Sequence, residues 1–147
     1  MAVRRDISDI SVVVNGLLTR YVEIHEECFN RPIWHYFKAI DFGGHRADAE
    51  QLIAAFQSCR NHLASMVGSD DREREYLETL RQYVESLMRT IEVLGIVLDG
   101  LHAKSQKWPS YNWSTYKSDL KNYEQSVDDY TALGARLNTL YRQLQIP

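Results

Sequence analysis

The chain has 147 residues, 44% hydrophobic and 25% charged, with a formal net charge of −3. This length suits one domain with a sizeable core, so we expect a single domain over residues 1–147. The mixed charge offers no basic face for nucleic acid, and the most apolar stretch, 87–101, is too short and too charged to span a membrane. No long apolar run follows Arg4 and Arg5, so we expect no signal peptide and a cytoplasmic location.

The first half of the chain predicts two helices. Apolar residues recur at steps of three and four over about 7–29 and again over about 46–67, a spacing typical of amphipathic helices. Pro32 ends the first helix, because proline disfavours helix at the residue before it. Residues 33–40 predict a short helix that caps the bundle, and residues 41–44 predict a turn. Gly68 fits the left-handed position that often follows a helix.

The second half predicts two longer helices, over about 70–104 and 114–144. Asp70 and Glu73 have the spacing of a capping box at the start of the third helix. Eight apolar residues then form one seam along that helix: Leu77, Leu80, Val84, Leu87, Ile91, Leu94, Leu98 and Leu101. Apolar residues also flank this seam, which favours a bundle over a lone coiled coil. We therefore predict an all-α, up-down-up-down four-helix bundle with two shorter and two longer helices.

Two aromatic clusters are candidate binding surfaces. Tryptophan and tyrosine are common anchors of protein interfaces. One pole of the bundle holds the connection between the first and second helices and the connection between the third and fourth. Six candidate partner-binding residues lie at this pole: Trp34, His35, Tyr36, Trp108, Tyr111 and Trp113. An end-plug of the bundle is the alternative interpretation of this pole. The third and fourth helices share a second cluster, for which an oligomer face and a half-exposed core edge are the alternatives: Tyr76, Tyr83, Tyr130 and Tyr141.

A metal site and catalysis have weaker signals. His25, Cys28, Asp99 and His102 map near one pole, but the Glu-x-x-His pairs of di-iron bundles are absent, so we predict no metal and no cofactor. Arg20 and His25 have the spacing of the Arg-x4-His motif, and this pair resembles HEPN-type helical ribonucleases. The motif lies late in that family's domain but in the first helix here, so we predict no enzyme.

These observations predict a non-enzymatic interaction module, such as an adaptor, inhibitor or regulatory subunit, that binds a protein partner. The surface would be either the aromatic pole or the tyrosine-rich face of the third and fourth helices. A bundle that binds a metal or small ligand through His25, Cys28, Asp99 and His102 is the alternative. Purely structural self-association into a homodimer through the fourth predicted helix is a third interpretation.

Overall fold

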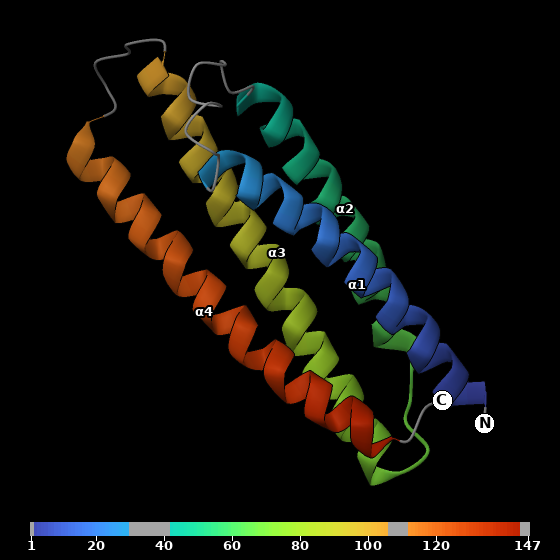
Figure 1. Cartoon of the computed structure of the whole chain (residues 1–147). Helices are drawn as coiled ribbons and strands as arrows, with labels where there is room; N and C mark the ends of the chain where they lie inside the picture. The colour runs from blue at the N-terminus through green and yellow to red at the C-terminus, as the bar shows by residue number, and fades with distance from the viewer. Residues whose placement is uncertain (1, 30–41, 106–111, 145–147) are drawn as a thin grey trace.

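The computed structural model describes residues 2–29, 42–105 and 112–144, and these form four helices (Figure 1). The helices are α1 (Ala2–Phe29), α2 (Phe42–Ser65), α3 (Asp71–Ser105) and α4 (Trp113–Gln143). The described residues contain no strand, and the predicted all-α four-helix bundle is confirmed. The predicted short helix over 33–40 lies outside the described residues.

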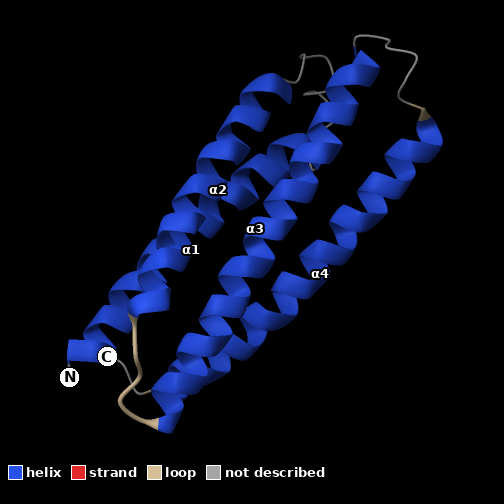
Figure 2. Ribbon diagram, turned by 180° about the vertical axis from the view of Figure 1, so that it is seen from behind, coloured by secondary structure: helices blue, strands red, loops and turns tan. Residues whose placement is uncertain are grey.

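The helices are packed around α3. Figures 1 and 2 show α2 and α4 on different sides of α3, with each helix running opposite to the one before it. The helix α1 packs mainly on α2 and touches α3 along a shorter stretch. No Cα atom of α1 lies within 8 Å of a Cα atom of α4. The first and last helices are therefore separated at the backbone, and only side chains cross between them.

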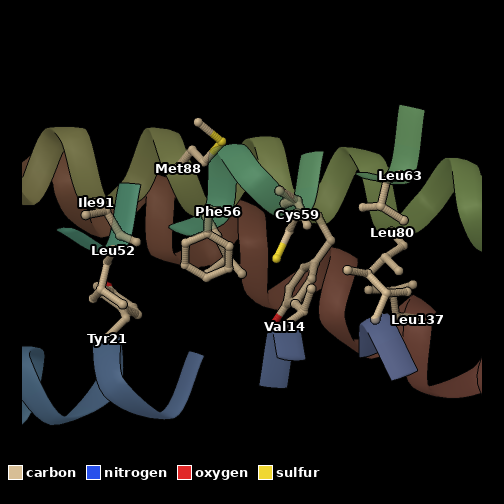
Figure 3. Packing of buried hydrophobic residues seen from close by; sticks show 14 of the residues in the cluster. Val14, Tyr21, Leu52, Phe56, Cys59, Leu63, Leu80, Met88, Ile91 and Leu137 are labelled. Carbon is tan, nitrogen blue, oxygen red and sulfur yellow. The ribbon is translucent and has the colours of Figure 1, made fainter. Parts of the chain in front are cut away.

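The α3 seam forms the core of the bundle. Seven of its eight predicted residues, from Leu77 to Leu98, are buried, while Leu101 is half-buried. Figure 3 shows this core from close by, with Leu80 and Ile91 of α3 facing labelled side chains of α1, α2 and α4. The flanking residues predicted to widen the buried stripe are buried as well: Tyr76, Tyr83, Met88 and Val97. The helix therefore contacts all three neighbours because its apolar stripe is broad.

One end of the bundle is closed by a polar junction. The carboxylate of Asp70 accepts a hydrogen bond from the backbone N–H of Glu73 at 2.8 Å, which confirms Asp70 as the cap of α3. Glu73 is buried and accepts hydrogen bonds from both the backbone N–H and the hydroxyl of Ser69. Arg4 donates to Glu73 at 3.0 Å, to Asp70 at 3.2 Å and to the carbonyl of Leu144 at 2.7 Å. This arginine joins the starts of α1 and α3 to the end of α4.

Three sequence predictions about helix ends are wrong. Helix α1 begins at Ala2 rather than near Ile7, because Arg4 anchors its first turn. Helix α2 begins at Phe42, so the predicted turn over 41–44 is helical from that residue on. Gly68 is not left-handed. A Cβ atom there would lie 2.6 Å from the backbone nitrogen of Arg74, so glycine is needed to let the connection pass the first turn of α3.

Among the described helices, none is long and apolar enough to cross a membrane.

Cys28 is half-buried on α1 and Cys59 is buried on α2, and neither forms a disulfide. Burial raises the pKa of the Cys59 thiol, which keeps it protonated and unreactive at neutral pH.

Candidate interaction groove

A groove of about 620 Å³ runs between α1 and α4, where the backbones of the two helices are separated. Its floor is formed by α3, chiefly by Tyr76, Leu80 and Tyr83. One wall is the α1 face that carries Ser11, Val12, Asn15, Leu18 and Val22. The opposite wall is the α4 face that carries Tyr130, Thr131, Gly134, Ala135, Asn138 and Tyr141. We call this feature the α1–α4 groove.

Beyond one end of the groove, hydrogen-bonded side chains bridge α1 and α4. The hydroxyls of Tyr21 on α1 and Tyr123 on α4 contact each other, and Tyr123 also lies 2.6 Å from Nδ1 of His25. Both partners are satisfied if Tyr21 donates to Tyr123 and Tyr123 donates to a neutral imidazole. Burial lowers the pKa of His25, which favours that neutral form. Phe29 stacks on the Tyr123 ring at 5.6 Å and covers the cluster.

A second, looser set of contacts lies toward the other end. Ser11 donates to the carbonyl of Ile7 at 2.7 Å, so its oxygen is left to accept the hydroxyl proton of Tyr76 at 2.8 Å. The hydroxyls of Ser8 and Tyr141 lie 3.4 Å apart across the gap between α1 and α4. Between these two ends the ring of Tyr21 on α1 meets the ring of Tyr130 on α4 edge-on, with 5.9 Å between their centroids.

The tyrosine floor depends on a glycine in α4. A Cβ atom at Gly134 would lie 3.2 Å from the ring of Tyr83, which is closer than most such contacts. The missing side chain leaves room for the Tyr83 ring to lie against the α4 backbone at the floor of the groove. The ring also lies 6.2 Å from that of Tyr130, while Tyr76 lies 5.7 Å from Tyr141. The predicted proximity of these tyrosines on α3 and α4 is confirmed.

The groove carries no formal charge at neutral pH. None of its described lining residues is Asp, Glu, Lys, Arg or His. Burial raises the pKa of Tyr83 to about 12 and raises the pKa of Tyr76 and Tyr130, so these phenols stay protonated. A surface without charge in a chain rich in charged residues is typical of the centre of a protein interface.

All four candidate oligomer-face tyrosines line this groove, but they are not equally exposed. Tyr76 and Tyr83 keep only 4% and 6% of their surface, while Tyr130 and Tyr141 are half-buried. The first two therefore form a floor rather than an outward face. Their membership of an oligomer interface stays a prediction.

The aromatic pole cannot be placed in the same way. Trp34, His35, Tyr36, Trp108 and Tyr111 lie outside the described residues. Trp113 is the first residue of α4, and its side chain is also outside the described part. The partner-binding role of these six residues stays a prediction.

The four candidate metal ligands all make contacts within the chain. His25 contacts Tyr123, and Asp99 forms an ion pair with Arg46 at 3.3 Å. Cys28 is half-buried on α1 and His102 is exposed near the end of α3. Within residues 2–29, 42–105 and 112–144, no three His, Cys, Asp or Glu side chains are grouped so that they could hold a metal ion.

The α1 wall was missed by sequence reasoning. Periodicity assigns Ile10, Val14 and Leu17 to the core seam but gives no role to Val12 and Val13 beside them. In the structure Val12 is 67% exposed and Val13 51%. The available signal was the absence of any charged residue from Ile10 to Thr19, on both faces of the helix.

No protein-family model, curated protein or solved structure matches this chain significantly.

Proposed function

We propose that this chain is a non-enzymatic protein-interaction module that binds one amphipathic helix of a partner protein in the α1–α4 groove. The observation that carries the proposal is the uncharged lining of the groove together with the exposed valines on its α1 rim. Exposed apolar side chains around a concave surface mark interaction sites more often than scattered surface residues do. A groove between two helices is also a common receptor for an amphipathic helix.

The dimensions of the groove suit a short helix. The lining residues run from Ser11 to Val22 on α1 and from Tyr130 to Tyr141 on α4. Each stretch spans about 16 Å at the helical rise of 1.5 Å per residue. This length matches about three turns of a bound helix, with apolar anchors at positions i, i+3 or i+4, and i+7.

Polar groups on the groove would set the register of the bound helix. The Tyr83 hydroxyl has no hydrogen-bond partner among the described residues. Asn15 on α1 and Asn138 on α4 are exposed and face the groove from opposite walls. We therefore expect the partner helix to present an apolar face that also carries a hydrogen-bonding side chain.

A displayed library of 16-residue amphipathic peptides tests the proposal. Peptides enriched on the wild-type protein are labelled, and their binding is measured by fluorescence anisotropy. The variant Ala135→Trp places a large ring on the groove wall and should weaken binding at least tenfold. Ala132→Trp is the matched control, because Ala132 is exposed on α4 but does not line the groove.

Enriched peptides with the expected spacing that bind wild type and A132W, but not A135W, would support the proposal. Two results would contradict it: enriched peptides that bind A135W as tightly as wild type, or a library from which nothing is enriched above a charged-peptide control.

A further inference from the structure

The solvent face of α1, away from the core, carries a second regular pattern. Its residues follow one another at steps of three or four, and all are exposed: Arg5, Asp9, Val12, Gly16, Arg20 and Glu23. This spacing places them on one stripe of the helix, which we call the α1 outer stripe. The stripe has charges at both ends and none in the middle, where Val13 adds a second exposed apolar side chain.

Gly16 lies at the centre of the outer stripe and has no role within the described bundle. A Cβ atom at this position would meet nothing within 4 Å. Glycine weakens an exposed helix interior relative to alanine, so its presence here has no local benefit. It would, however, let the backbone of another helix approach closely, with valine side chains on either side of the contact.

The charges of the outer stripe complement each other when the stripe is paired with a copy of itself in reverse. An antiparallel pair with a two-fold axis near Val14 places Arg5 opposite Glu23 of the other copy. The same axis places Asp9 opposite Arg20, and Val12 opposite Gly16. A parallel pair in register would instead oppose like charges. Complementary charges of this kind fix the orientation of paired helices.

The four charged side chains are available for such contacts. Arg5, Asp9, Arg20 and Glu23 form no ion pair with any described residue of their own chain. Arg4, one residue before Arg5, shows the contrast, because it is bound at three points within the bundle. The charges of the stripe therefore form no ion pair within the described monomer, and each faces an opposite charge in the antiparallel pair.

We propose that two copies of this chain form a homodimer in which the α1 outer stripes pack antiparallel about a two-fold axis near Val14. This association is separate from the helix binding proposed for the α1–α4 groove, although Val12 borders both surfaces. An interface between single helices is small, so we expect a dissociation constant on the order of 1–100 µM.

Sedimentation velocity of the full chain at several concentrations tests the dimer, and charge reversals test its geometry. R5E alone should weaken the dimer about tenfold, because each of its two Arg5–Glu23 pairs becomes repulsive. E23R alone should have the same effect. The double variant R5E/E23R should restore the wild-type affinity, because both pairs are then reversed together.

A further variant, Gly16→Glu, distinguishes loss of the dimer from loss of the fold. Gly16→Glu should abolish dimerisation while helicity is retained, since glutamate is a better helix former than glycine. Val67→Asp is the matched control at an exposed valine outside the stripe. A chain that stays monomeric throughout the concentration series would overturn the proposal. So would a dimer insensitive to the charge reversals, or a double variant as weak as the singles. The A135W variant should leave the dimer intact, so failure of the groove proposal is seen separately.

Discussion

The hydrogen-bonded cluster of Tyr21, Tyr123 and His25 offers a quantitative test of how side chains hold α1 and α4 together. Tyr123→Phe removes one hydroxyl that contacts both Tyr21 and His25. Tyr21 is 1% exposed, so its hydroxyl would lose its acceptor with little access to water. An unsatisfied buried donor costs about 1–3 kcal/mol, and the half-buried His25 adds little because water can reach it. We therefore expect Tyr123→Phe to lower the free energy of unfolding by about 2 kcal/mol.

Urea denaturation followed by circular dichroism at 222 nm measures this change, and the melting temperature should fall by about 4–8 °C. The double variant Tyr21→Phe/Tyr123→Phe removes both hydroxyls, so it should lose about 1 kcal/mol less than the sum of the single variants. Tyr141→Phe is the control for the same chemical change at a half-buried tyrosine whose hydroxyl lies 3.4 Å from Ser8. A Tyr123→Phe variant as stable as Tyr141→Phe, or strictly additive single variants, would refute this account of the cluster.

Two further predictions concern pH and glycine. Burial lowers the pKa of His25 in the folded state, so on acidification the unfolded chain takes up the imidazole proton before the folded chain does. The contribution of neutral His25 to the free energy of unfolding is therefore complete above about pH 6.5 and decreases as the pH falls below that value. Urea titrations between pH 7.5 and 5 should show this decrease, and it should be absent in His25→Asn. Gly16→Ala should raise the free energy of unfolding by about 0.5–1 kcal/mol because the new methyl group meets nothing. Gly134→Ala should instead lower it by about 1 kcal/mol, because the ring of Tyr83 must move. Equal effects at the two glycines, measured in dilute samples, would contradict the packing described for the groove.

Local periodicity was enough to predict the four helices and the α3 seam. The three-and-four spacing from Leu77 to Leu98 depends only on the geometry of one helix, so it can be recognised without knowing the neighbours. The cap at Asp70 is equally local, because its carboxylate binds a backbone N–H three residues away. The start of α1 was not predictable in this way. Arg4 contacts residues 66 to 140 positions further along the chain.

Only the α3 and α4 sides of the groove could be predicted from the sequence. Tyr76, Tyr83, Tyr130 and Tyr141 could be assigned to facing positions of α3 and α4 from their spacing. Periodicity shows which side of a helix is buried, but not how far apart two helices lie. The separation of α1 from α4 depends on the volume of side chains such as Tyr21 and Tyr123, whose hydroxyls meet between them. The α1 wall of the groove therefore required the structure.

The position of α3 has a consequence for how the bundle forms and opens. Helices α2 and α4 each pack along α3 as its sequence neighbours, whereas α1 packs mainly on α2. Two helical hairpins that share α3 can form early, because contacts between neighbouring segments close short loops. We therefore expect helix α1 to dock last and to detach first, as a local opening that leaves α2, α3 and α4 folded. Such an opening would widen the groove without global unfolding, so amide hydrogens of α1 should exchange faster than those of α3.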